Sequence, residues 1–157
     1  MMQVNICAVG RLRAGPEKAL VDDYLTRFDR TGRGLRLGPA KVIEVEDKRG
    51  SSMAAEAELL EQSVPKGSII CVMDERGKVM TSPEFTQLLA GWRDQGQSAV
   101  SFIIGGADGI EPKLQKRADA RISFGRMVWP HMLARVMLSE QLYRAASILA
   151  NKPYHRS

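Results

Sequence analysis

Short strand-like runs alternate with helical segments along the whole chain, and this alternation is what most constrains the fold. Two of the runs, residues 68–73 and 99–104, are apolar nearly throughout, as expected of strands buried on both faces of a parallel sheet. Because helices separate consecutive strands, we expect an α/β fold with a mostly parallel sheet flanked by helices. The other strand-like runs are residues 4–9, 41–46 and 120–124.

Helical segments are predicted from apolar periodicity and from residues that favour helix starts. Pro16 suits a first turn, and Ser82 followed by Pro83 resembles a capped start with proline at the first helical position. Either Ser51 or Ser52 is expected to cap the helix that begins near residue 53. The predicted helices cover residues 16–28, 53–64, 83–95, 111–117 and 131–150, and the predicted loops and turns include 31–39, 47–52 and 74–78.

Length and composition favour one globular domain, residues 1–157. Apolar residues make up 44% and charged residues 26% of the chain, which are ordinary globular values. The net charge of +5 is a weak indication of a polyanionic partner such as nucleic acid. No apolar run approaches the roughly 20 residues that cross a bilayer, and no secretory signal is visible at the start. We therefore expect a soluble intracellular protein without a membrane partner.

Cysteine and histidine usage argues against a metal site. Cys7 and Cys71 each lie inside an apolar strand-like run, and no C-x-x-C motif is present. The histidines, His131 and His155, are 24 positions apart without neighbouring ligand residues, which makes a zinc site improbable. Buried, reduced thiols are the simpler interpretation.

Ligands of parallel sheets bind beyond the carboxyl ends of the strands, and three such ends stand out here. They are residues 73–75, the glycine run 105–109, and 124–129. Glycines allow a ligand to approach the main chain closely, although a tight strand-to-helix turn explains the run equally well. The first strand lacks the G-x-G of a dinucleotide fold, and no phosphate-binding loop motif occurs.

The C-terminal segment is unusual in two respects. The predicted helix 131–150 is apolar nearly all round, so it needs burial in a core or against a partner. Within it, Glu140 and Arg144 have the spacing of an intrahelical ion pair or of groups that face a site. His131 is most simply a satisfied polar residue of the first turn. The chain then ends in Tyr154, His155 and Arg156, which are uncommon in a merely fraying terminus.

Three motifs together resemble a known family. Residues 102–109 (FIIGGADG), 138–145 (LSEQLYRA) and 153–156 (PYHR) are similar to those of the RlmH (YbeA-type) family in the SPOUT methyltransferase superfamily, and the resemblance extends over the whole chain. It implies an S-adenosyl-L-methionine-dependent enzyme that methylates N3 of a pseudouridine in helix 69 of 23S rRNA, within the assembled ribosome. It also implies an α/β fold with a C-terminal trefoil knot, a homodimer and a cytoplasmic location.

The resemblance further implies which residues form the site. The cofactor contacts fall at the three strand ends, where backbone groups would hold adenine and ribose between apolar walls. Tyr154, His155 and Arg156 would reach the site of the partner subunit. By residue type, His155 is expected to accept the N3 proton, Arg156 to bind phosphate or the developing anion, and Tyr154 to stack on the base. The implied cofactor-binding residues are Met73, Gly105, Phe124, Gly125, Arg126, Met127, Val128 and Trp129.

Two alternatives remain open at the level of sequence. One is a SPOUT enzyme that acts on another RNA, either tRNA or a ribose 2′-OH. The other is a ribosome-associated protein that binds RNA without catalysis. Basic loop residues are candidate rRNA contacts in each case, or simply a solvated surface, namely Arg11, Arg13, Lys48 and Arg49.

Overall fold

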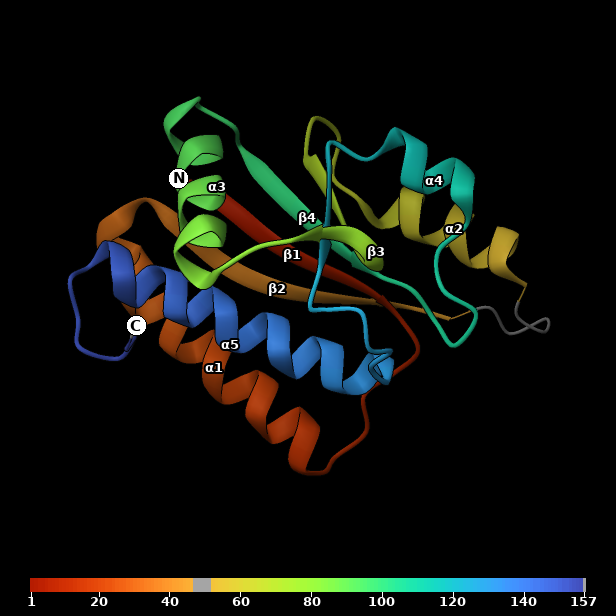
Figure 1. Ribbon diagram of the computed structural model, residues 1–157, viewed down its shortest axis with the longest axis horizontal. Coiled ribbons are helices and arrows are strands. Elements are labelled where there is room, and N and C mark those ends of the chain that lie inside the picture. The colour runs from red at the N-terminus through yellow and green to blue at the C-terminus, as the bar shows by residue number, and fades with distance from the viewer. Residues whose placement is uncertain (47–51, 157) are drawn as a thin grey trace.

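The computed structural model describes residues 1–46 and 52–156. These residues form one five-stranded sheet, in the order β2-β1-β4-β3-β5, with every neighbouring pair of strands parallel. The predicted α/β architecture is therefore confirmed, and Figure 1 shows helices on both faces of the sheet. The elements are β1 (Met2–Val9), α1 (Pro16–Gly32), the 3₁₀ helix η1 (Arg33–Leu35), β2 (Leu37–Val45), α2 (Met53–Ser63), β3 (Ile69–Val79), α3 (Ser82–Asp94), β4 (Ala99–Ile104), α4 (Pro112–Arg117), β5 (Ala120–Ser123) and α5 (His131–Leu149).

Alternate residues of the central strands supply two separate cores. Ile6 and Phe102 point to the face covered by α1, α3 and α5, whereas Cys7 and Ile103 point to the face covered by α2 and α4. This two-sided burial follows from the strand period of two, and it explains why residues 99–104 are apolar without alternation. Cys7 and Cys71 are both buried and free, as predicted.

Helix α5 packs along α1 on the larger core (Figure 1). Its middle and C-terminal turns are buried through Leu138, Leu142 and Ala145. Its first turn differs, because Met132 and Leu133 are each 41% exposed. The expectation that this helix is buried on every side is thus met only in part within one chain. Among the described residues, none of the helices has the length and apolar character needed to span a membrane.

The predicted loop at 31–39 is wrong for much of its length. Helix α1 continues to Gly32, and β2 begins at Leu37 rather than at residue 41. Leu37 and Gly38 are buried, and Leu37 pairs with Met2 of β1. Glycine and proline made this stretch resemble a loop, but β2 lies at the edge of the sheet, where a strand tolerates both.

The predicted polar loop at 74–78 is also wrong, because β3 continues to Val79. The pairing of β3 with β5 shifts register after Met73 and resumes at Lys78. Between these points the chain lies close against β5 at Gly77, where a Cβ atom would lie 2.7 Å from the carbonyl carbon of Arg121 and the amide nitrogen of Ile122. Such an approach between two backbones admits only glycine, so tertiary packing overrides the polar composition here.

Helix starts were predicted closely but not in every detail. Ser52 caps α2 by accepting from the amide of Ala55, as predicted, while the alternative Ser51 and most of the predicted turn 47–52 lie outside the described residues. Helix α3 is capped by Thr81 and not by Ser82: the Thr81 side chain and Glu84 form a reciprocal capping box. The capping box satisfies two backbone donors, which a lone Ser82 cap would not.

Candidate functional site

A cleft of about 600 Å³ opens at the carboxyl ends of β4 and β5, beside residues 73–76 in the middle of β3. This is the edge of the sheet where the sequence predicted a ligand, and the volume is within the range of small-molecule sites. The three strand ends that were singled out meet there, although they are far apart in the sequence. The lining consists of Met73, Asp74, Glu75, Arg76, Ile104, Gly105, Gly106, Ala107, Asp108, Gly109, Ile110, Ile122, Phe124, Gly125, Met127, Val128, Trp129, Pro130, His131 and Ala134.

The glycine run after β4 forms a tight turn whose backbone lines the cleft. Gly109 donates its amide to the carbonyl of Gly106 at 3.0 Å and has a φ of 84°, which favours glycine. At Gly105, a Cβ atom would lie 2.6 Å from the Gly109 carbonyl oxygen. The run is therefore the tight turn that the sequence allowed, and the same absence of side chains leaves its main chain beside the cleft.

The opposite wall follows β5. The Ser123 hydroxyl donates to the carbonyl of Gly125 at 2.7 Å and accepts from its amide at 3.0 Å, which fixes the bend. Beyond it, Met127 and Val128 are 75% and 76% exposed, and Trp129 is 42% exposed. This wall is apolar and only partly covered by the chain itself.

Seven of the eight predicted cofactor-binding residues line the cleft, and Arg126 is the one outside the described lining. Asp74 and Glu75, which belong to the first of the predicted strand ends, also line the cleft, and Arg76 joins them at a charged rim that the sequence did not indicate. His131, which lies in the wall, was underestimated as well. Proximity to Trp129 and Pro130 in the sequence was the one signal that pointed to His131.

His131 is not the satisfied first-turn residue that the sequence suggested. Its Nδ1 atom is buried and has no hydrogen-bond partner among the described residues. Burial, and then the charge of Arg135, lower the pKa of the imidazole from its ordinary value of 6.5. A neutral imidazole with one nitrogen unoccupied is therefore a feature of this wall.

Arg135 anchors α5 beside the cleft. Its side chain is 1% exposed and bonds Glu44 at 2.7 Å. It also donates to the carbonyl oxygens of Val9 and Gly10, at 2.8 and 2.7 Å. Glu44 in turn accepts from the amide of Leu12 at 2.6 Å. These bonds tie the start of α5 to the ends of β1 and β2, and so position the wall that carries His131.

The last residues of the chain form a second polar arrangement, which we call the C-terminal cluster. Arg144 bonds the Glu140 carboxylate through Nε, at 3.1 and 3.2 Å, and through Nη2, at 2.6 Å. Tyr154 donates its hydroxyl to Glu140 at 2.6 Å, and its ring lies 4.6 Å from that of Tyr143. The Nδ1 atom of His155 lies 3.1 Å from Nη1 of Arg144. Glu140 and Arg144 are thus an intrahelical pair that also holds the tail.

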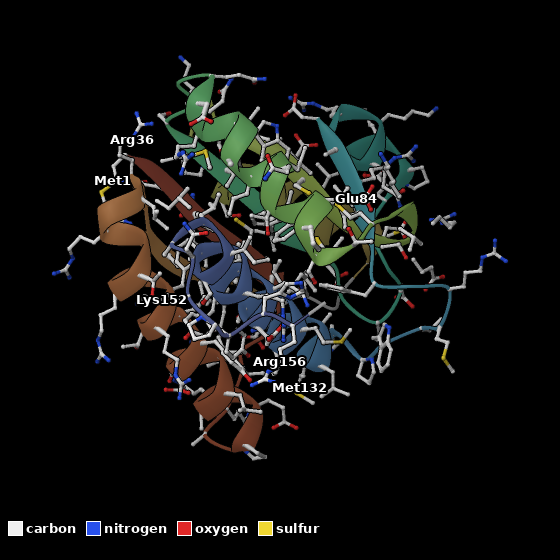
Figure 2. The ribbon with its side chains drawn as sticks, turned by 60° about the vertical axis from the view of Figure 1, so that its left-hand side comes forward. Met1, Arg36, Glu84, Met132, Lys152 and Arg156 are labelled. Carbon is white, nitrogen blue, oxygen red and sulfur yellow. The ribbon has the colours of Figure 1, made fainter. Side chains whose placement is uncertain are left out.

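The C-terminal cluster does not meet the cleft of its own chain. Figure 2 labels Lys152 and Arg156 on the segment that follows α5 and folds back onto it, and Figure 1 places the C-terminus beside the C-terminal half of that helix. Glu140 lies about 13 Å beyond His131 along the helix axis, at about 1.5 Å per residue. None of the three predicted catalytic residues is among the described residues that line the cleft.

Within residues 1–46 and 52–156, no three side chains of the metal-binding types gather closely enough to hold an ion. The groups that the site offers are instead backbone amides and carbonyls, apolar walls and a few polar side chains. Such an arrangement suits an organic ligand.

Comparison with known proteins identifies the family. Residues 2–155 match the family described as "Predicted SPOUT methyltransferase". The chain belongs to this family. The resemblance drawn from the three motifs is therefore confirmed, and the relatives refine it. The chain is 66% identical to ribosomal RNA large subunit methyltransferase H of Dinoroseobacter shibae and 65% identical to that of a Ruegeria species, over 99% of each chain.

Solved structures share the fold at much lower identity. A probable methylase family protein from Haemophilus influenzae Rd KW20 has a TM-score of 0.55 at 11% identity, covering 99% of this chain and 71% of that one. A probable methyltransferase from Bordetella pertussis Tohama I has a TM-score of 0.54 at 8% identity, covering 92% of this chain and 96% of that one. At these identities the likeness concerns the fold alone.

Proposed function

We propose that this SPOUT methyltransferase transfers the methyl group of S-adenosyl-L-methionine to N3 of a pseudouridine in helix 69 of 23S rRNA, within the assembled ribosome. The observation that carries the proposal is the cleft itself. It unites the glycine turn at Gly105 with the apolar wall at Met127 and Trp129, at the positions that the family motifs implied. The names of the full-length relatives supply the large-subunit rRNA as substrate.

The cleft fits the cofactor by shape and by chemistry. The side-chain-free turn at Gly105 and Gly109 leaves backbone groups close to the cavity, suited to an adenine and a ribose. Met73 and Met127 supply polarizable apolar walls, and Phe124 through Trp129 enclose the other side. Arg126 would contribute through its backbone, since its side chain is exposed. Bound there, S-adenosyl-L-methionine would supply an electrophilic methyl group on a sulfonium.

Methyl transfer to N3 needs an in-line approach and the loss of the N3 proton. The N3 electron pair would form the new bond to carbon, and the electrons of the carbon–sulfur bond would return to the sulfur of the cofactor. The protein contributes mainly by positioning. We assign the contacts to the base to Tyr154, His155 and Arg156, with Arg156 bonding phosphate or developing negative charge.

A homodimer would bring these residues to the chemistry. Because the tail lies on the far part of α5 from its own cleft, a second copy is the natural source of a tail for each cleft. Exposed apolar side chains beside the cleft offer the surface on which such a copy would pack. They are Met127, Val128, Trp129, Met132 and Leu133.

The trefoil knot and the cellular location are part of the same proposal. The family resemblance is what supports the knot, since knots are rare exceptions to ordinary topology. Ribosomal substrate implies a cytoplasmic enzyme. The excess of positive charge, +5, favours association with rRNA. Arg11 and Arg13 are candidate contacts, while Lys48 and Arg49 lie outside the described residues.

The decisive experiment is transfer of a radiolabelled methyl group to ribosomes from cells that lack the enzyme, compared with free 23S rRNA and with tRNA. We expect label in assembled ribosomes, at one nucleotide of helix 69, and little in free rRNA. Label in tRNA or on a ribose would favour a different RNA target. Absence of label from every RNA, with S-adenosyl-L-methionine bound in calorimetry, would refute the enzymatic assignment.

The dimer is tested separately by sedimentation. A dimer at micromolar concentration is expected, and Leu133→Glu should dissociate it while leaving the fold intact in circular dichroism. Mixing two inactive variants, one altered at Gly105 and one at His155, should restore about a quarter of the activity if cleft and tail come from different chains. A failure to complement would contradict the shared site.

A further inference from the structure

The contact between Arg144 and His155 determines where the proton of the imidazole lies. The two nitrogens, Nη1 and Nδ1, are 3.1 Å apart. A guanidinium only donates hydrogen bonds, so Nδ1 must be the acceptor. A neutral imidazole whose Nδ1 accepts carries its proton on Nε2. The lone pair that would make His155 a base is therefore occupied, and the nitrogen left free is a donor.

Arg144 is held in the orientation that this bond needs. The Glu140 carboxylate accepts from Nε and Nη2, which fixes the guanidinium plane in the way of a two-pronged ion pair. The Tyr154 ring lies 4.8 Å below the guanidinium carbon. Nη1 is left to reach His155. Because the Glu140 bond raises the pKa of Arg144, the guanidinium stays charged.

Tyr154 has its proton placed by the same carboxylate. Burial and then the bond to Glu140 raise the pKa of its phenol above the ordinary value of 10. The phenol is thus neutral and donates to Glu140 at 2.6 Å. Within the C-terminal cluster, the Glu140 carboxylate accepts from Arg144 and Tyr154, and Nδ1 of His155 is engaged by Arg144.

We propose that Arg144, oriented by Glu140, is a positioning residue that makes His155 a hydrogen-bond donor through Nε2 in the methyl-transfer reaction. This inference rests on the proposed function and gives His155 the opposite role to the one expected from residue type. When the N3 proton leaves to solvent water, negative charge spreads from N3 onto the two flanking carbonyl oxygens of the base. An Nε2–H donor to one of these oxygens stabilises the anion whose N3 then attacks the methyl group.

Nuclear magnetic resonance of the ¹⁵N-labelled, full-length protein tests the proton position directly. The chain has two histidines, so the variant His131→Gln assigns the signals of His155 unambiguously. We expect Nε2 to be protonated, Nδ1 to be unprotonated, and a coupling across the hydrogen bond between Nδ1 and a side-chain nitrogen of Arg144. A protonated Nδ1 in the neutral wild-type ring would overturn the inference.

Arg27 and Arg144 lie over two neighbouring tyrosine rings and provide a matched pair of variants. Arg27 lies 5.8 Å from the centre of the Tyr143 ring and pairs with Asp23, with no bond to His155 among the described contacts. Arg144→Gln should abolish the coupling to Nδ1 and lower kcat about 100-fold, the effect of a misplaced catalytic group. The dissociation constant of the cofactor should change by no more than about twofold, well short of the tenfold change that corresponds to 1.4 kcal/mol. Arg27→Gln should change neither the coupling nor kcat.

Glu140→Gln serves as a second variant should Arg144→Gln unfold. It keeps an acceptor for Arg144 but loses the charge, so a weaker coupling and an intermediate kcat are expected. Full kcat in Arg144→Gln would contradict the positioning role. The outcomes also separate the two proposals. A wild-type protein that methylates no RNA refutes the proposed function alone, whereas an active protein with Nδ1 protonated refutes the role of Arg144 alone.

Discussion

The cleft and the C-terminal cluster differ in what forms them: backbone shape in the first and side-chain hydrogen bonds in the second. The cleft depends on backbone shape: a turn free of side chains at Gly105, a bend at Gly125 and apolar walls. The C-terminal cluster depends on side-chain identity, since Glu140, Arg144 and Tyr154 bond one another at distances from 2.6 to 3.2 Å. One region is sensitive to added volume, and the other is sensitive to a lost donor or acceptor.

This difference separates binding from chemistry. A backbone-lined cleft holds the parts of a ligand that do not react, whereas a network of charged hydrogen bonds sets proton positions. Changes in the cleft should therefore alter affinity, and changes in the C-terminal cluster should alter turnover.

Gly105→Val should nearly abolish cofactor binding. The Cβ atom alone would lie 2.6 Å from the Gly109 carbonyl oxygen, so the turn must open into the cleft. We expect S-adenosyl-L-methionine to bind at least about 100-fold more weakly in calorimetry, a loss of about 2.7 kcal/mol. Gly91→Ala is the control, because a Cβ there meets open space, and it should bind normally. If Gly105→Val bound S-adenosyl-L-methionine with unchanged affinity, the turn would not be part of the cofactor site.

Arg135→Met should destabilise the fold rather than the chemistry. It leaves Glu44 without its 2.7 Å partner and the carbonyl oxygens of Val9 and Gly10 without a donor. We expect the free energy of unfolding in urea to fall by about 3 kcal/mol. Arg117→Met, which removes an exposed pair with Glu61, should cost less than about 1 kcal/mol. Equal losses would show that burial of Arg135 is unimportant.

Tyr154→Phe should lower turnover while cofactor affinity stays constant. The variant keeps the aromatic contact with Tyr143 but loses the 2.6 Å bond to Glu140. A charge-assisted bond of about 1.5 kcal/mol corresponds to roughly tenfold in kcat. Steady-state kinetics with ribosomes measures kcat, and calorimetry measures the affinity. If the affinity for S-adenosyl-L-methionine fell as much as kcat, the C-terminal cluster would contribute to cofactor binding, and the division between the two regions would be wrong.

The smallest expected effect is a dependence of stability on pH through His131. Burial lowers the pKa of this imidazole below 6.5, so near that pH the unfolded chain binds more protons than the folded chain. Stability should therefore rise as pH increases to about 6.5 and then level off, with a small loss on the acid side. Urea midpoints measure it. His131→Gln should flatten the curve, and an unchanged curve would assign the effect to other groups.

Much of the fold was predictable because local patterns encode it. The apolar run at Ala99–Ile104 predicted a strand, and β4 is buried at every position. Pro112 and His131 begin helices where the sequence indicated. The two wrong loops, 31–39 and 74–78, have the glycines and charges of loops. Tertiary position decided otherwise: the first holds the end of α1, a 3₁₀ turn and the start of the edge strand β2, and the second continues β3 against β5.

The cleft was partly predictable for the same reason. Strand ends are visible in sequence, and parallel strands place their carboxyl ends at one edge of the sheet. His131 was undervalued because its buried, unpartnered nitrogen is a property of packing. The role of Arg144 was equally out of reach, since its i, i+4 spacing to Glu140 says nothing about a third group that folds back from the tail.

The sequence by itself determined the alternation of strands and helices, the parallel sheet, and the family through three short motifs. Local periodicity and backbone preference are enough for these, since they act between near neighbours. Only the tertiary structure decided that Met73, Gly105 and Trp129 line one cleft and that Nδ1 of His155 accepts from Arg144. Such contacts join residues that are far apart in the sequence. They depend on how α5 and the tail pack, which a local sequence pattern does not determine.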